Sequence, residues 1–206
     1  MKAISVAFKA FRKINEHISS LFYTPIAKIY LFLNDVHYKK GLKVNGFLKL
    51  HVTRRGCVLI GNNCNINSGH NSNIIGRQQK STLWVEGKLT IGDNVGMSSV
   101  AIICNHEIEI ADNVIIGGNT VIYDSDFHSL NPLIRNDKTK DKINAKWGKV
   151  TICENVFIGA HTTILKGVRI GKNAVVGACS VITKNIQDNE IWAGNPAKCI
   201  SVRTKE

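Results

Sequence analysis

The chain has 206 residues, 44% of them hydrophobic, and a formal net charge of +12 at pH 7. This length favours one domain with a short extension, and the hydrophobic content is sufficient for a buried core. None of the six cysteines belongs to a C-x-x-C pair, which argues against zinc-ribbon and thioredoxin-like proteins, and no stretch approaches the length of a transmembrane helix.

The first segment, residues 1–40, is expected to be basic and helical, with a break at Pro25 and a second helix over residues 26–33. Residues 1–55 carry eleven Lys or Arg against two carboxylates, so +9 of the net charge lies there. Two interpretations remain open: the helix covers the open end of the following domain, or residues 1–33 make a peripheral contact with an anionic membrane surface. No recognised nucleic-acid-binding motif accompanies the charge, so no nucleic-acid partner is expected.

Basic residues also interrupt the first apolar run, and no small-residue cleavage site follows it, so no secretory signal is expected. The sequence therefore predicts a cytoplasmic protein with free thiols, at the inner face of the membrane if the second interpretation holds.

From residue 41 onward aliphatic residues begin to recur at intervals of six, with an irregular loop expected over residues 67–82. The repeat restarts after that loop, and a shift of one residue predicts a seven-residue turn near residues 104–109. Two sets of phased positions define the shift: Ile91, Met97 and Ile103, then Ile110, Ile116 and Ile122.

The repeat stops between residues 124 and 149, where the chain is polar and has no aliphatic phase. Insertions in repeat proteins leave the stack as loops on one face, and such loops often carry function. Loop 124–149 includes Asp126, His128 and Arg135, so we expect it to carry the chemistry.

Residues 152–186 hold the strictest repeat, and a six-residue period suits neither a helix nor an alternating strand. It predicts a solenoid of triangular coils, about 18 residues each, over residues 41–187, with residues 188–206 packing as a tail on the last coils. The phased aliphatic residues are Ile152, Ile158, Ile164, Ile170, Val176 and Ile182. The small or β-branched residues two places before them are Val156, Thr162, Val168, Ala174 and Ser180.

The segments IGAHTTILKGVRIGKNAVVGACSVITK and WAGNPAK, together with the loop IYDSDFHSLNPLIRN, resemble the hexapeptide-repeat acyltransferases. The likeness is to the maltose, galactoside and polysaccharide O-acetyltransferase branch. It implies an all-β solenoid, specifically a left-handed parallel β-helix, with the N-terminal helical segment and the extruded loop as additions. It also implies a homotrimer, acetyl-CoA as donor, no required metal and a sugar or sugar-linked acceptor.

The resemblance places His128 at the position of the catalytic histidine. A sugar hydroxyl has a pKa far above 7, so a neutral imidazole is suited to take its proton during attack on the thioester. The other ring nitrogen then needs an acceptor, either a backbone carbonyl or a carboxylate. Direct transfer is expected, because no cysteine lies beside a base as a carrier nucleophile.

Further roles are implied by the same resemblance. Asn105 and Asp126 are candidates for acceptor contact, although Asp126 could instead orient the loop or equally be a solvated loop carboxylate. Phe157 stands where relatives commonly have Trp, which puts a stacking role for that ring in doubt. The candidates for CoA contact are Ala160 and Ala178, at corners one coil apart, and Thr183, Lys184 and Lys198, toward the adenosine phosphate end.

Three other functions compete with this interpretation. N-acetylation of an amino sugar uses the same chemistry and stays open. A γ-class carbonic anhydrase needs three zinc-binding histidines with two close in sequence, and His106, His128 and His161 lack that close pair. A non-catalytic binding solenoid would have no need of the histidine loop.

Overall fold

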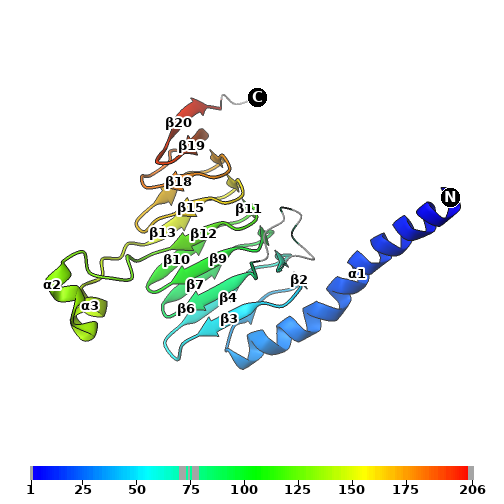
Figure 1. Ribbon diagram of the computed structural model, residues 1–206, viewed down its shortest axis with the longest axis horizontal. Coiled ribbons are helices and arrows are strands. Elements are labelled where there is room, and N and C mark those ends of the chain that lie inside the picture. Colours follow the sequence, from blue (N-terminus) through cyan, green and yellow to red (C-terminus); the bar gives the residue numbers. More distant parts are fainter. Residues whose placement is uncertain (1, 70–72, 74, 76–78, 204–206) are drawn as a thin grey trace.

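The computed structural model describes residues 2–69, 73, 75 and 79–203. Short strands wind into coils stacked along one axis, with the N-terminal helix at one end and the C-terminus at the other (Figure 1). The predicted all-β solenoid is therefore confirmed. Part of the loop expected at residues 67–82, namely 70–72, 74 and 76–78, lies outside the described residues.

Three sheets form the sides of the solenoid within the described residues, and their strands pair in parallel except at the C-terminal hairpin. The first contains β1 (His37–Tyr38), β4 (Cys57–Ile60), β7 (Lys88–Ile91), β10 (Glu107–Ile110), β13 (Val150–Ile152) and β16 (Arg169–Ile170). The second contains β2 (Lys43–Asn45), β5 (Asn65–Asn67), β8 (Gly96–Ser98), β11 (Ile115–Ile116), β14 (Phe157–Ile158), β17 (Val175–Val176), β19 (Glu190–Gly194) and β20 (Ala197–Val202). The third contains β3 (Lys49–Val52), β6 (Thr82–Val85), β9 (Ala101–Cys104), β12 (Val121–Tyr123), β15 (Thr163–Ile164) and β18 (Val181–Ile182).

The six-residue repeat builds the core as predicted. Every phased aliphatic side chain from Ile152 to Ile182 is fully buried, and the small residues two places before them are buried at the corners. Ile158 pairs with Val176, so one coil advances 176 − 158 = 18 residues. A two-residue strand turns one side chain inward and one outward, and stacking the inward ones fills the interior.

One phase assignment was wrong. Ile103 faces outward, whereas Ile102 and Cys104 are buried. The reason is that β9 has four residues, so alternation along it points two of them inward. The following corner, at residues 105–106, absorbs the extra length, and the inward position resumes at Ile108.

The inward and outward residues of β11 allow a matched test of this core. Ile116 is 2% exposed and Ile115 is 56% exposed. Replacing Ile116 with Ala should lower the free energy of unfolding by roughly 2–5 kcal/mol, because it leaves a cavity in a tightly packed column. Replacing Ile115 with Ala should change it by less than about 0.5 kcal/mol. Chemical denaturation of both variants measures the difference, and equal losses would contradict the assigned alternation.

The corners between the first and second sheets are held by a ladder of asparagines and aspartates. At six of these corners one asparagine has a positive φ, between 54° and 64°. Several of these asparagine amides bond from one coil to the next, as Asn94 does to Asn113 at 3.0 Å. The asparagines are Asn63, Asn94, Asn113, Asn155, Asn173 and Asn189. The Asp93 carboxylate accepts hydrogen bonds from the backbone N–H of Asn62 at 2.7 Å and from its amide at 3.0 Å. These bonds, with a smaller effect of Lys39, lower the pKa of Asp93.

A lowered pKa in the folded state makes the stability contribution of Asp93 depend on pH. The carboxylate favours the folded state above the pKa of an unfolded aspartate, about 3.9, and this contribution disappears as pH falls through the lower folded value. We therefore expect the stability difference between the wild type and D93N to be constant from neutral pH to about pH 5 and to shrink below about pH 4. Urea denaturation across this range tests it, and a difference that grows on acidification would contradict the assignment.

The N-terminal helix differs from its prediction. α1 (Lys2–Leu33) is one continuous helix that includes Pro25, so the predicted break is wrong. Proline removes one backbone hydrogen bond at a cost of about 3 kcal/mol. Contacts of the last turns offset this cost: Ala27 and Leu31 are buried in the core, and the Thr24 hydroxyl bonds to both the N–H and the carbonyl of Val44.

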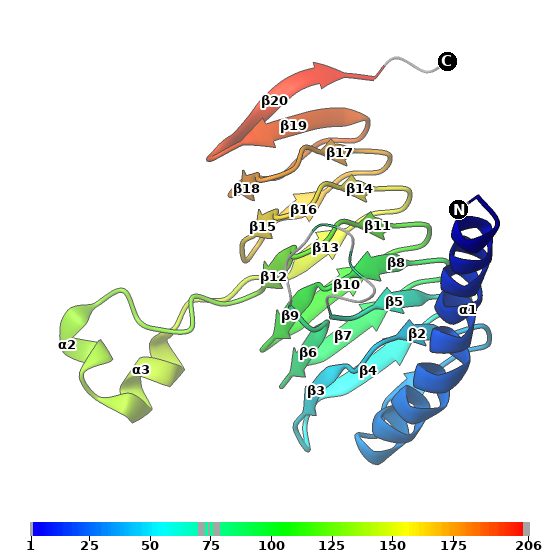
Figure 2. The same cartoon turned by 45° about the vertical axis from the view of Figure 1, so that its right-hand side comes forward.

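The C-terminal turns of α1 pack on the first coil, and the rest of the helix extends away from the solenoid (Figure 1). Figure 2 turns this helix toward the viewer. Residues 4–6 and 8–10 are exposed accordingly. Within the described residues, no helix is both long enough and apolar enough to cross a membrane.

Candidate active site

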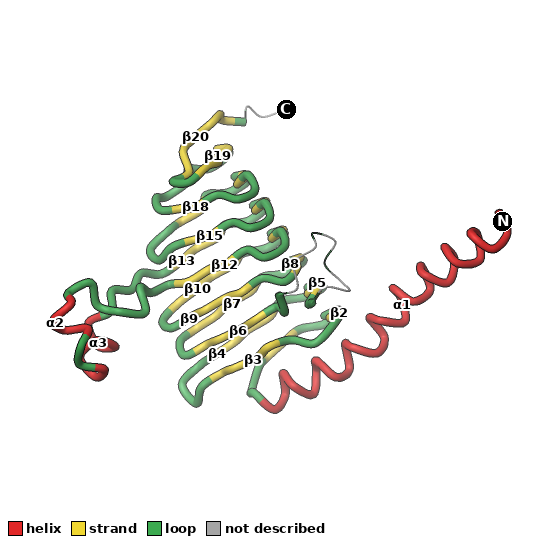
Figure 3. The backbone as a smooth tube through the Cα atoms, in the orientation of Figure 1, coloured by secondary structure: helices red, strands yellow, loops and turns green. Residues whose placement is uncertain are grey.

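Loop 124–149 leaves the solenoid between β12 and β13 as an arm, and it contains two short helices that its sequence was not predicted to form (Figure 3). Asn131 caps α2 (Pro132–Arg135) by accepting from the N–H of Leu133. Asp137 caps α3 (Lys138–Asn144) by accepting from two N–H groups. Both caps are residue types that favour helix starts, a signal present in the sequence.

The arm holds the predicted catalytic histidine against a carboxylate. His128 Nδ1 lies 2.6 Å from Asp141 Oδ2, and the other oxygen of Asp141 accepts from the N–H of Ser129 at 2.6 Å. The Asp141 side chain is 11% exposed, whereas that of His128 is 68% exposed. The carboxylate therefore fixes one edge of the imidazole and leaves the other edge accessible.

The environment of Asp141 keeps it ionised. The hydrogen bond from His128 contributes most to lowering the pKa of this carboxyl, followed by the N–H of Ser129 and the nearby charges of His128 and Arg135. When the ring is neutral, an ionised acceptor at Nδ1 selects the tautomer with its proton on that nitrogen, and Nε2 then carries the free lone pair. Sequence reasoning expected an acceptor for the histidine but did not identify Asp141.

The root of the arm is fixed by a second buried carboxylate. Asp124 is fully buried and accepts from three consecutive backbone N–H groups, those of Asn105, His106 and Glu107, at 2.7–2.9 Å. The Asn105 amide donates to Ser125 Oγ at 2.8 Å. These bonds hold the corner containing Asn105 beside the start of the arm.

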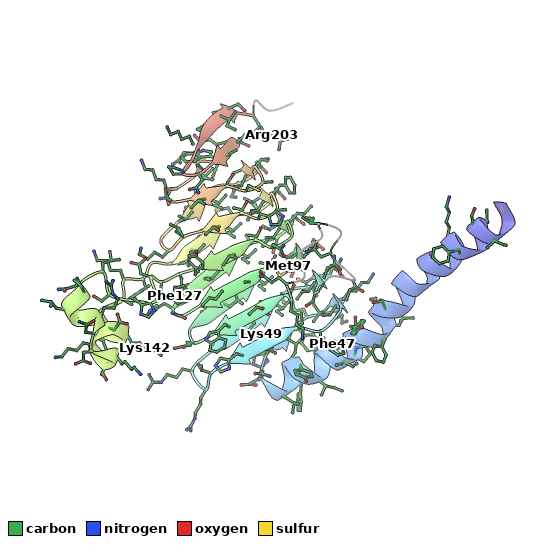
Figure 4. All side chains as sticks on the ribbon, in the orientation of Figure 1. Phe47, Lys49, Met97, Phe127, Lys142 and Arg203 are labelled. Carbon is green, nitrogen blue, oxygen red and sulfur yellow. The ribbon has the colours of Figure 1, made fainter. Side chains whose placement is uncertain are left out.

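A groove of about 830 Å³ lies between the arm and the outer face of the third sheet. In Figure 4 Phe127 and Lys142 lie on the arm side and Lys49 on the strand side. His128, Asn105 and Asp141 line it, together with Trp84 of β6 and Ile103. The structure thus brings together His128 and one of the two predicted acceptor residues. The outward position of Ile103, which the sequence phase missed, makes it part of this wall.

Aromatic and charged side chains lie along the groove. The ring of Trp84 stacks on His51 with centroids 3.9 Å apart, and His106 stacks on Trp147 at 4.4 Å. Lys142 bonds to Glu86 at 3.1 Å, which links α3 to the strand face. The groove therefore offers aromatic faces and amines beside the histidine.

Asp126, the other predicted acceptor residue, lies outside the groove lining. Its Oδ1 is 2.5 Å from Lys166 Nζ, and its side chain is 21% exposed. This ion pair joins the arm to the following coil, so the structure gives Asp126 a contact that orients the arm.

The predicted CoA residues lie on other parts of the solenoid. Ala160 and Ala178 stack one coil apart at the corner between the second and third sheets, where Cys179 N–H donates to the Ala160 carbonyl at 2.8 Å. Thr183 and Lys184 follow β18 and are exposed, and Lys198 is exposed on β20 opposite Ala193. The structure places the two alanines together as expected and leaves each of the other three side chains accessible.

Two remaining candidate positions, His161 and Phe157, lie outside the groove lining. His161 lies at the corner beside Ala160, far along the chain from the groove residues His106 and His128. Among the described residues, no group of three or more His, Cys, Asp or Glu side chains is placed to hold a metal ion. Phe157 is 47% exposed on β14 and does not line the groove.

One known protein family matches a segment of the chain. Residues 149–184 match the family described as bacterial transferase hexapeptide (six repeats). Over this segment the chain is similar to hexapeptide-repeat proteins. With its parallel sheets, this match confirms the predicted left-handed parallel β-helix class.

Two of the relatives by sequence are galactoside O-acetyltransferases. The chain is 34% identical to a galactoside O-acetyltransferase of Lactococcus lactis over 140 residues, which are 66% of this chain and 59% of that protein. It is 31% identical to the galactoside O-acetyltransferase of Escherichia coli over 126 residues, covering 57% of this chain and 59% of the relative. The chain thus spans less than two thirds of the length of these curated relatives.

Solved structures of acyltransferases share the fold over more of the chain. AntD, an N-acyltransferase from Bacillus cereus in complex with dTDP and 3-hydroxybutyryl-CoA, is 26% identical, with a TM-score of 0.64 over 86% of this chain and 88% of that one. A maltose O-acetyltransferase from Clostridium difficile is 25% identical, with a TM-score of 0.51 over 81% of this chain and 71% of that one.

Proposed function

We propose that the chain is an acetyl-CoA-dependent acetyltransferase that acts on a hydroxyl of a sugar or polysaccharide precursor. The observation that carries the proposal is the His128–Asp141 pair, in which the carboxylate holds Nδ1 and the accessible side of the imidazole faces the groove. The sugar acetyltransferases among the relatives support the reaction class.

In this mechanism Nε2 of His128 accepts the proton of the acceptor hydroxyl as the oxygen attacks the thioester carbonyl. The tetrahedral oxyanion collapses, the carbon–sulfur bond breaks, and the imidazolium returns the proton to the CoA thiolate. Asp141 stabilises the imidazolium between these two steps, because its negative charge lies 2.6 Å from Nδ1.

Transfer is direct in this proposal, without an acetyl-enzyme. Cys104 is the cysteine adjacent to the Asn105 corner, and burial together with the charge of Asp124 raises the pKa of its thiol to about 12. A thiol with that pKa is almost entirely protonated at neutral pH and is a poor nucleophile. The acceptor oxygen therefore attacks acetyl-CoA itself.

The groove is suited to a sugar acceptor. The exposed part of the Trp84 ring offers an apolar face for the C–H side of a pyranose, and Asn105 offers a polar group next to the histidine. The amines of Lys49 and Lys138 also line the groove and would favour an acceptor that carries negative charge.

CoA would lie along the corner of Ala160 and Ala178, where small side chains let a pantetheine arm approach the backbone. Thr183, Lys184 and Lys198 would meet its adenosine phosphates. This corner and the arm belong to different edges of the solenoid. A homotrimer, in which one copy presents its corner to the groove of the next, would bring them together.

N-acetylation of an amino sugar is the second candidate, and the AntD likeness favours it. Another AntD complex, a mutant with dTDP-4-amino-4,6-dideoxyglucose and CoA, has a TM-score of 0.63 to this chain over 87% of its length. A neutral amine needs less help from a base than a hydroxyl does, so loss of the histidine would affect N-transfer less.

The test is thiol release from acetyl-CoA against a panel of sugars, amino sugars and nucleotide sugars, with mass spectrometry of the products. The proposal predicts release that depends on the acceptor and an O-acetylated product. An N-acetylated product would select the second candidate. No release with any acceptor, together with no acetyl-CoA binding by calorimetry, would indicate a non-catalytic binding solenoid.

A further inference from the structure

An apolar stripe runs along α1. Its members are all between 58% and 76% exposed, and at about 100° per residue they fall within a sector of about 60° on the helix surface. They are Ile4, Phe8, Phe22, Ile29 and Leu33. Large aliphatic and aromatic side chains aligned on one side of a helix normally face a core, a partner or a lipid surface.

The stripe faces away from the solenoid. Ala27 and Leu31, which are buried against the first coil, lie on roughly the opposite side of the helix. Thr24, bonded to Val44, lies on that same inner side. α1 extends away from the coils (Figure 1), and the side chains of the stripe are exposed in the described part of the chain.

The surroundings of the stripe are strongly basic. Lys9 and Lys28 are exposed on α1 itself. More exposed cations lie on the first coils, at the end where the helix is anchored: Lys39, Lys40, Lys43, Arg54 and Arg55. Against them residues 1–55 contain only two carboxylates, Glu16 and Asp35.

We propose that α1 lies on an anionic lipid surface, with the stripe at the boundary between headgroups and acyl chains and the basic residues toward the headgroups. Apolar burial and attraction to anionic lipid act together in helices of this kind. The binding is peripheral, and it goes beyond the acyl-transfer proposal and does not depend on it.

The net charge of α1 favours an anionic lipid surface over a second copy of the chain as the partner of the stripe. Residues 2–33 carry five Lys or Arg and one Glu, a net charge of 5 − 1 = +4. Pairing two stripes would bring two such helices into contact, and the like charges would repel. An anionic bilayer instead buries the same apolar surface and neutralises the charge.

The experiment is flotation of the full chain with vesicles of phosphatidylcholine alone and of phosphatidylcholine mixed with phosphatidylglycerol. We expect the wild type to float with the mixed vesicles, at least about tenfold less with the neutral ones, and less as salt is raised. The triple variant F22E/I29E/L33E should lose at least about tenfold in binding. The control L133E/I143E/I200E adds the same charge at exposed apolar positions outside α1 and should float like the wild type.

Circular dichroism and thermal unfolding show whether the variants fold, which is expected because all the changed side chains are exposed. Failure of the wild type to float with anionic vesicles would overturn the proposal, as would a folded F22E/I29E/L33E variant that floats unchanged. Light scattering measures the mass of the oligomer and so tests whether a second copy of the chain covers the stripe instead. A loss of oligomer mass in the triple variant, without vesicle binding by the wild type, would assign the stripe to contacts between copies.

Discussion

Replacing His128 with Ala is expected to lower kcat for acetyl transfer roughly 10²–10⁴-fold. The His128 imidazole is the base that Asp141 orients beside the groove, and the substitution removes that oriented base. The KM for acetyl-CoA should change little, because His128 lies on the arm and the proposed CoA residues lie elsewhere on the solenoid, with Ala160 and Ala178 at a different corner. Steady-state thiol release with the acceptor found in the panel measures both constants.

The matched control is H37A, which removes an exposed histidine on β1, outside the groove lining. It should leave kcat within about twofold, as expected for a surface substitution. A loss below about fivefold in H128A, in a protein that retains wild-type oligomeric state and unfolding temperature, would refute the general-base role.

Replacing Asp141 with Asn is expected to lower kcat by a comparable factor, roughly 10²–10⁴, although Asp141 does not face the reacting atoms. An amide can no longer stabilise the imidazolium by charge, and it can present its N–H₂ to Nδ1 and so favour the wrong tautomer. Asp141 is a positioning residue in this account. The double variant H128A/D141N should therefore be no slower than H128A, because residues that act as a unit have non-additive effects.

Asp137 provides the control for this substitution. It is on the same arm and caps α3, and Asn caps helices as well as Asp does. D137N should leave kcat within about twofold. Multiplicative losses in H128A/D141N would show that Asp141 acts on something other than the histidine, such as the fold of the arm.

The solenoid could be predicted from the sequence because its order is local. Each coil needs an inward aliphatic residue and a small corner residue at fixed intervals, and the run from Ile152 to Ile182 shows both without interruption. Where a strand has four residues, as β9 does, two side chains point inward instead of one. The six-residue period therefore predicted Ile103 as an inward residue in place of Ile102.

The parts that depend on contacts distant in sequence were not predicted. The continuity of α1 through Pro25 depends on the anchoring of Thr24 and Leu31 to the first coil. The partner of His128 is thirteen residues away, and it reaches the ring only because α3 forms and folds back. The Asp137 cap was the available signal for that helix, but a helix of seven residues is too short to show an apolar period.

A crystal structure of the protein with CoA tests the central claim most directly. The account predicts that the CoA sulfur lies in the groove, roughly 3–4 Å from Nε2 of His128, with the pantetheine arm along Ala160 and Ala178 of a neighbouring copy. A CoA thiol bound away from His128 in every copy of the assembly would contradict it.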